Sequence, residues 1–250
     1  MVITVSEIKN DTYHFFSNQI SSIFFISIFI TFFSILINMF IQPNTQIVTI
    51  IENNKFIDTR SLLDLLYHMN IEEKNELFKY CILKIIALLI NKTLLLSSVI
   101  TLIFTVSKNK ETTITPLTSS LFKSIPNLLV LNLITAFFVQ LGFMFFVIPG
   151  VLLSMVLSLA PIILSFKENT LIESIFLSMN ICWKNIKIIA PGFLFWICSK
   201  SILTIIISNM IFLNKNVLFL ISNISMNLLY SLLIIYLFRF YMIFLRSCKN

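Results

Sequence analysis

The sequence predicts an all-α fold, a polytopic bundle of about six transmembrane helices with short amphipathic helices. From Leu128 to Phe166 the chain has thirty-nine residues without a charged side chain, interrupted only by Pro149-Gly150. A helix of that length is roughly 58 Å long, close to two crossings of a hydrocarbon core about 30 Å thick. Hydrophobic residues make up 58 % of the 250-residue chain and charged residues 12 %, against about 25 % charged in an average soluble chain. We therefore expect one integral membrane domain over residues 1–250.

Uncharged or nearly uncharged runs define the individual spans. The long run divides at Pro149-Gly150, and its second half, at sixteen residues, is short for a crossing. Lys92 near the start of the second span and Lys200 in the middle of the fifth are the charged residues inside the runs. We expect six spans, at residues 20–41, 85–106, 128–148, 151–166, 188–213 and 217–238.

Positive charge in the connecting segments predicts the orientation. Both termini share one side with ten basic residues: Lys9, Lys108, Lys110, Lys123, Lys167, Lys184, Lys187, Arg239, Arg246 and Lys249. The other side has six: Lys55, Arg60, Lys74, Lys79, Lys84 and Lys215. The excess predicts cytoplasmic N- and C-termini and an external loop at 42–84, in the inner (plasma) membrane of a bacterium. No Ala-x-Ala cleavage pattern follows the first apolar run, so we expect that span to remain as an anchor.

The external loop contains two helix-start signals. Ser61-Leu62-Leu63-Asp64 and Asn70-Ile71-Glu72-Glu73 both resemble N-caps with an acid three residues on. The second signal predicts a helix that continues without a break into the second span. The apolar face of the first helix would consist of Leu62, Leu63, Leu66 and Met69. This segment is either an ordinary amphipathic connector or a periplasmic lid or docking surface.

Residues 170–187 predict an amphipathic helix at the membrane surface. Thr170-Leu171-Ile172-Glu173 is a capping box, and apolar residues at helical spacing follow it: Ile172, Ile175, Phe176, Met179, Trp183 and Ile186. Trp183, Lys184 and Lys187 suit an interface, with the indole among the headgroups and the amines toward anionic lipid. We interpret the segment as an interfacial elbow between two spans; a cytoplasmic docking helix for a partner is the alternative.

Lys200 is the candidate for an intramembrane polar site. An ammonium at the middle of a span is costly and is by default a functional hypothesis. Because the predicted spans contain no acid, its partners would be carbonyls, Gln140, Asn132 or a lipid phosphate. Pro191-Gly192 near the start of the same span would free carbonyls and favour a cavity. A structural polar contact between spans is the alternative.

Motifs for catalysis or metal binding are absent from the sequence. His14 and His68 lie on opposite sides of the predicted topology, and the cysteines have no CxxC spacing. No HExxH, GxSxG or glycine-rich phosphate loop occurs. We therefore expect no catalytic residues, no cofactor, no metal and no enzymatic activity. The net charge of +7 indicates membrane lipids rather than nucleic acid as the partner, and membrane-protein partners stay open.

Several short matches extend over nearly the whole chain. They are Asp11-Thr12 with Phe15-Phe16, Val147-Ile148-Pro149-Gly150, Ala160-Pro161, Ala190-Pro191, Lys200 and Ile235-Tyr236-Leu237-Phe238-Arg239. With these pieces the chain resembles the YciC-type family of gammaproteobacterial inner-membrane proteins. A smaller set, which includes Ser178 and Trp183-Lys184-Asn185, is similar to the membrane domain of some glycerophosphodiesterases. The resemblance implies a six-span inner-membrane protein and brings no activity with it.

Three classes of function therefore remain. A structural or envelope-maintenance protein is the leading interpretation, because no chemistry is visible in the spans. A small-molecule or lipid transporter or channel comes second, and it rests on Lys200, the Pro-Gly breaks, Gln140 and Asn132. An enzyme acting on lipids comes last, because no nucleophile–base or metal constellation is present.

Overall fold

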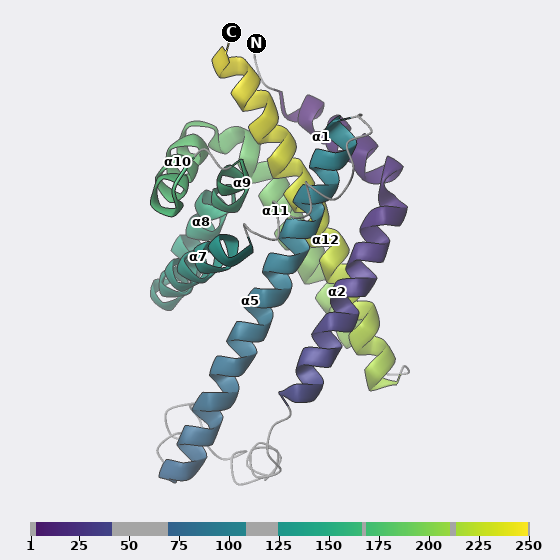
Figure 1. The fold of residues 1–250 in the computed structure, drawn as a ribbon, viewed down its shortest axis with the longest axis vertical. Coiled ribbons are helices and arrows are strands. Elements are labelled where there is room, and N and C mark those ends of the chain that lie inside the picture. Colours follow the sequence, from purple (N-terminus) through teal and green to yellow (C-terminus); the bar gives the residue numbers. More distant parts are fainter. Residues whose placement is uncertain (1–3, 42–69, 109–124, 167–168, 211–213, 250) are drawn as a thin grey trace. The chain divides into compact units, whose positions relative to one another are not determined.

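A computed structural model describes residues 4–41, 70–108, 125–166, 169–210 and 214–249 (Figure 1). Nearly all of these residues are helical and none forms a strand, which confirms the all-α prediction. The chain forms two compact units, Met1–Thr31 with Lys92–Asn250, and Phe32–Asn91. The helices are α1 (Val5–Asn18), α2 (Ile20–Phe40), α5 (Ile71–Lys108), α7 (Ile125–Phe145), α8 (Val147–Leu157), α9 (Ala160–Ser165), α10 (Leu171–Lys184), α11 (Ile186–Ser208) and α12 (Lys215–Lys249).

Six stretches in the described chain are long and apolar enough to cross a membrane. They are Ile20–Phe40, Ile71–Ser107, Ile125–Phe145, Val147–Ser165, Ile186–Ser208 and Asn216–Ser247. Each contains most of one expected span. The fifth ends earlier than the expected residue 213, at Ser208, and the last helix continues eleven residues beyond the expected end at 238, to Lys249. Apolarity therefore located the helices but not their ends, because polar residues extend a helix beyond its apolar part.

The predicted helix start at Asn70 is confirmed. The backbone N–H of Asn70 donates to Oε2 of Glu73 over 2.9 Å, and α5 continues from Ile71 to Lys108 without a break. Residues 71–84 of the expected external loop are therefore helical. The other expected cap, at Ser61, and the apolar face that follows it lie outside the described residues.

The turn of the long apolar run is not at Pro149-Gly150, as predicted, but at Phe146. Phe146 is extended, with φ −160° and ψ 159°, between the end of α7 and the start of α8. Proline is compatible with the first turn of a helix, where its missing N–H has no partner to lose, so Pro149 does not end the helix. Gly150 instead permits close packing, because a Cβ on Gly142 would lie 3.0 Å from its Cα.

The expected span at 151–166 consists of two helices. A turn at Ser158 and Leu159, both still in the αR conformation, separates α8 from α9, and the Ser158 N–H donates to the carbonyl of Met155, three residues earlier. Pro161 lies in the first turn of α9 and cannot donate to a carbonyl of α8. Ser178 of α10 holds the end of α8, since its Oγ donates to the Val156 carbonyl over 2.6 Å.

Helix α1 was not predicted from the sequence. It packs on α12 through Ile8, Thr12 and Phe15, all of them buried (Figure 1). The guanidinium of Arg239 on α12 lies 4.9 Å from the ring centre of Phe15. Helix α1 contains polar residues such as Asp11 and therefore has no long apolar run. A search for membrane spans does not detect it.

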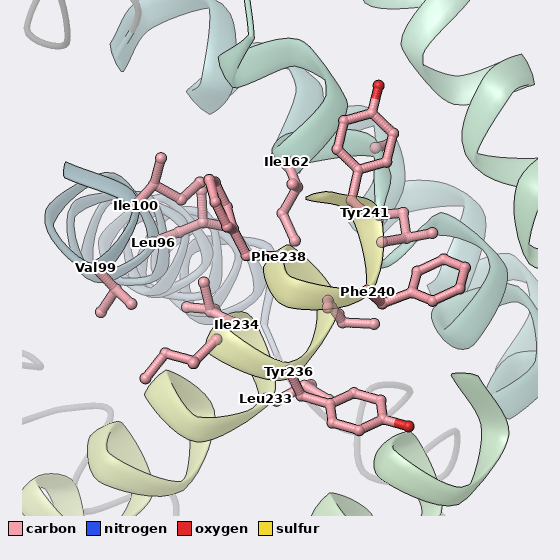
Figure 2. Close-up of a cluster of buried hydrophobic side chains, with 14 of the residues drawn as sticks. Leu96, Val99, Ile100, Ile162, Leu233, Ile234, Tyr236, Phe238, Phe240 and Tyr241 are labelled. Atoms are coloured by element: carbon pink, nitrogen blue, oxygen red, sulfur yellow. The ribbon is translucent and has the colours of Figure 1, made fainter. Parts of the chain in front are cut away.

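The core of the larger unit lies around the middle of α12. Figure 2 shows Ile234 and Phe238 directed toward Leu96 and Ile100 of α5, while Tyr236 points to the other side of α12. The rings of Phe104, Phe166 and Phe238 extend this core with centroids 5.2–5.5 Å apart. Contacts of this kind add about 0.5–1.5 kcal/mol each to the burial of the rings.

The smaller unit contains the end of α2 and the start of α5. Nζ of Lys84 donates to Oδ1 of Asn38 over 2.7 Å and lies 5.7 Å from the ring centre of Tyr80. Lys79 and Glu76 form an exposed ion pair of 3.3 Å, one helical turn apart. Lys84 thus has an amide and a ring as partners, and Lys79 has a carboxylate, at the polar end of a long apolar helix.

Candidate functional site

A cavity of about 270 Å³ lies inside the larger unit, between α5, α7, α8, α9, α11 and α12. Most of its wall is apolar, with aliphatic side chains from α12 on one side and α7 on the other. Polar side chains interrupt this wall: Lys92, Asn132, Thr135, Gln140, Ser154, Ser158, Trp196 and Tyr230. A polar patch in an otherwise apolar cavity is the usual form of a ligand site.

Part of this polar wall is already hydrogen-bonded within the protein. Nδ2 of Asn132 donates to Oγ1 of Thr93 over 2.9 Å and joins α7 to α5. The hydroxyls of Thr135, Ser154 and Ser158 donate to carbonyls three residues earlier in the chain, over 2.6–3.1 Å. The three hydroxyl oxygens can still accept hydrogen bonds, but their protons are already donated within the protein.

Four other side chains have donors to offer. Lys92, Gln140, Trp196 and Tyr230 make no side-chain hydrogen bond within the part of the chain that the structure describes. Nζ of Lys92 lies 5.6 Å from the ring centre of Tyr230, a cation–π contact that leaves the ammonium protons available. An ammonium, an indole N–H, a phenol and an amide therefore line one cavity.

The cavity has an uncompensated positive charge. Its wall contains Lys92, whose side chain is exposed, and no Asp or Glu. Away from water an ammonium needs a counter-ion or hydrogen-bond acceptors, because its desolvation is otherwise unfavourable by several kcal/mol. The arrangement therefore suits an anionic group that accepts several hydrogen bonds, attached to an apolar body that matches the rest of the wall.

The structure brings two of the three predicted polar residues together. Asn132 and Gln140 both line the cavity, Asn132 buried and Gln140 exposed. Lys200 does not line it: it is exposed on α11, and its Nζ lies 5.5 Å from the ring centre of Trp196. The cation of the cavity is instead Lys92, which the sequence marked only as the other charged residue in a span.

The capping box of α10 is confirmed. Oγ1 of Thr170 accepts from the Glu173 N–H over 3.4 Å, and Oε2 of Glu173 accepts from the Thr170 N–H over 2.9 Å. These bonds, the one from the Thr170 backbone above all, hold the pKa of the Glu173 carboxyl below its ordinary value. Glu173 thus caps α10 as a carboxylate.

The candidate interfacial residues lie on the outer side of α10 and at the start of α11. Trp183 is 55 % exposed, and Lys184 and Lys187 are exposed beside it. The buried side of α10 consists of Ser174, Ser178, Ile181 and Cys182. Burial raises the pKa of the Cys182 thiol to about 12, so this cysteine stays protonated and unreactive.

Metal-ligating residues are not grouped within the described ranges, which contain no cluster of three or more His, Cys, Asp or Glu. His14 is exposed on α1, and His68 lies outside the described residues. Cys81 and Cys198 are exposed and, like Cys182, free thiols. The cavity around Lys92 is therefore the candidate site.

Comparison with known proteins places the whole chain in one family. Residues 1–243 match the model of the uncharacterised protein family UPF0259. A UPF0259 membrane protein of Buchnera aphidicola subsp. Acyrthosiphon pisum (strain APS) is 59 % identical over 247 residues, covering 99 % of this chain and 100 % of the relative. A UPF0259 membrane protein of Serratia proteamaculans (strain 568) is 30 % identical over 251 residues, covering 99 % and 100 %.

No solved structure matches the chain. The distant likeness to the membrane domain of glycerophosphodiesterases stays a prediction, whereas the YciC-type resemblance is consistent with these relatives. The six long apolar helices and the full-length match to a curated membrane protein both indicate a multi-pass membrane protein. The chain belongs to the UPF0259 family of multi-pass membrane proteins.

Proposed function

We propose that this protein serves envelope maintenance by binding an anionic amphiphile in the cavity around Lys92. The ligand has a phosphate or carboxylate group and at least one hydrocarbon chain, as membrane phospholipids and fatty acids do. The observation that carries the proposal is an ammonium without an acidic partner, inside a membrane protein, next to three unused hydrogen-bond donors.

The size of the cavity favours a headgroup. Its volume of about 270 Å³ is at the lower end of the about 300–1,000 Å³ that take drug-sized ligands. A glycerophosphate or carboxylate end fits this space, and the remaining hydrocarbon would lie between the helices or in the bilayer. A lipid anion also reaches Lys92 from within the membrane, so it needs no aqueous path.

The proposed location is the inner membrane of a bacterium, with both termini in the cytoplasm. The packing of α1 on α12 supports this, because it holds the two ends of the chain on one side of the membrane. The ten-to-six distribution of basic residues supports the cytoplasm as that side.

Transport of the same anion is the second candidate. The turn at Ser158–Leu159 and Pro191 inside α11 favour it, since interrupted helices at membrane depth are typical of transporters. Phe193 and Trp196, which line the cavity, follow Pro191 within two turns, so a bend there would change the shape of the site. Flux of labelled lipid between leaflets of reconstituted vesicles distinguishes transport from static binding.

Paired lysine variants test the proposed function in cells. Lys92→Met removes the cation that lines the cavity. Lys200→Met is the matched control, because Lys200 is exposed like Lys92 but does not line the cavity, and methionine keeps a long flexible side chain at both positions. We expect the Lys200→Met protein to complement a deletion strain under envelope stress and the Lys92→Met protein, at equal abundance in the membrane, to fail. If only the Lys200→Met protein failed to complement the deletion strain, the proposal would be contradicted and the functional cation would lie on α11.

A further inference from the structure

We propose that a groove between α1, α11 and α12 binds one acyl chain of an anionic phospholipid, whose phosphate is held by Lys9. This site is separate from the cavity around Lys92 and needs no assumption about it. One residue of α12, Leu233, lines both and divides them.

The groove is larger than the cavity and almost wholly apolar. It has a volume of about 430 Å³, with walls that include Tyr13 and Phe16 of α1 and Pro191 and Phe195 of α11. Tyr13 and Phe195 are 69 % and 60 % exposed, so the groove opens outward. A hydrocarbon chain is the ligand that matches a long apolar surface of this kind in a membrane.

The floor of the groove is formed where the Tyr236 ring packs directly on Gly192, which has no side chain. A Cβ at this position would lie 2.3 Å from Cε1 of Tyr236. The Tyr236 hydroxyl donates to the Ile188 carbonyl over 2.6 Å, which fixes the ring against α11. The pair Gly192–Tyr236 thus forms a rigid, shallow base between two helices.

Lys9 supplies a single positive charge at the edge of the groove. At 100° per residue it lies on the same side of α1 as Val5 and Tyr13, which also line the groove, while Glu7 and Asp11 lie about 160° away. Lys9 is exposed and forms no ion pair within the described part of the chain. Its ammonium is therefore free for an anion at the groove mouth.

The depth of these residues matches a phospholipid. Helix α1 ends at Asn18, and the first apolar span begins two residues later at Ile20, so α1 lies at the level of the headgroups. Pro191 lies five residues after the start of α11, about 7 Å along the helix, at the polar end of that span. A phosphate at Lys9 then places its acyl chain in the groove and pointing toward the hydrocarbon.

Photo-cross-linking in lipid nanodiscs tests the site. The full chain is reconstituted in equal parts of phosphatidylcholine and phosphatidylglycerol, with a diazirine on the acyl chain of one lipid at a time. We expect phosphatidylglycerol to label Tyr13 and Phe195 in excess of Phe25 and Phe29 of α2, which are 70 % and 68 % exposed and serve as the ordinary lipid-facing comparison. Equal labelling of both regions would mean ordinary surrounding lipid and would overturn the proposal.

Two variants separate the chain site from the phosphate site. Leu232→Trp fills the groove from α12 and leaves α1 with Lys9 unchanged, and we expect it to remove the excess labelling for both lipids. Lys9→Gln should lower the preference for phosphatidylglycerol about fivefold, the equivalent of the about 1 kcal/mol that a basic residue contributes near an anionic surface. Lys184→Gln, at an exposed lysine on α10, should leave it unchanged.

An unchanged preference in Lys9→Gln, or a loss of equal size in Lys184→Gln, would overturn the role of Lys9. Cross-links from Tyr13 to a second copy of the chain in place of lipid would show that protein covers the groove and would overturn the lipid assignment. Circular dichroism of each variant confirms that the helices are retained before labelling is compared.

Discussion

Substitution of Gly192 by alanine tests the packing of α11 on α12. The added Cβ would lie 2.3, 2.6 and 2.7 Å from Cε1, Cδ1 and Cζ of Tyr236, so the ring has to move. Tyr236 is only 6 % exposed, and its hydroxyl gives up the hydrogen bond to Ile188 when the ring shifts. Overpacking of this kind destabilises by about 1–3 kcal/mol and the lost hydrogen bond by about 1 kcal/mol.

An opposing effect has to be subtracted. Alanine favours a helix interior over glycine by about 0.8–1 kcal/mol, so Gly192→Ala should lower the free energy of unfolding by about 1–3 kcal/mol in total. Equilibrium unfolding in mixed detergent micelles, followed by circular dichroism, measures this change.

A double-mutant cycle supplies the control. In a Tyr236→Leu background the ring is absent, so the same Gly192→Ala change should be neutral or stabilising, with the helix propensity alone remaining. A Gly192→Ala protein as stable as the wild type in the native background would refute the close contact between α11 and α12.

Three further changes test other parts of the structure. Ser178→Ala removes the 2.6 Å bond to the Val156 carbonyl and should destabilise by about 1 kcal/mol, whereas Ser201→Ala, at an exposed position, should change the unfolding free energy little. The depressed pKa of Glu173 gives stability that is present above pH 4.5 and lost as pH falls through the folded-state value, so Glu173→Gln should show less acid destabilisation than the wild type in pH-dependent unfolding. Because Phe146 joins two of the six spans, a cysteine at this position should react with a membrane-impermeant maleimide from the external side. Protection from both sides would show that this hairpin does not cross the membrane.

The number and order of the spans could be predicted from the sequence. A long uncharged run such as 20–41 indicates a membrane span, because a helix of this length that is apolar on every side is typical of a lipid bilayer. Capping signals at Asn70 and Thr170 act locally, through hydrogen bonds to residues three positions away, so they too could be identified without tertiary structure.

The cavity could not be predicted in the same way. In a helix that is apolar on all sides no periodicity indicates which face lines a cavity, so the sequence favoured Lys200 only by its position at the middle of a span. Only the packing of the helices brings Lys92 next to Asn132 and Tyr230. Lys200 is exposed, as Lys92 is, but it does not line the cavity.

The turn at Phe146 and the amphipathic helix α1 show two other limits. Pro149-Gly150 is a common signal for a turn, but proline is also favoured in the first turn of a helix. In the structure the pair lies in α8, where Gly150 packs closely against Gly142. Helix α1 depends on burial of Ile8 and Phe15 against α12, a tertiary contact that local patterns do not encode.

Binding of phosphatidylglycerol to the purified, delipidated full chain in detergent tests the central claim most directly. A fluorescent phosphatidylglycerol is titrated into three proteins that all carry Lys9→Gln and the groove-filling change Leu232→Trp, so that the groove does not contribute. One of them keeps both Lys92 and Lys200, and the other two carry Lys92→Met or Lys200→Met. Loss of a charged hydrogen bond of about 1.5–3 kcal/mol should weaken binding by about tenfold to a hundredfold in Lys92→Met and leave Lys200→Met unchanged. Equal affinity of the Lys92→Met and wild-type cavities would contradict the account.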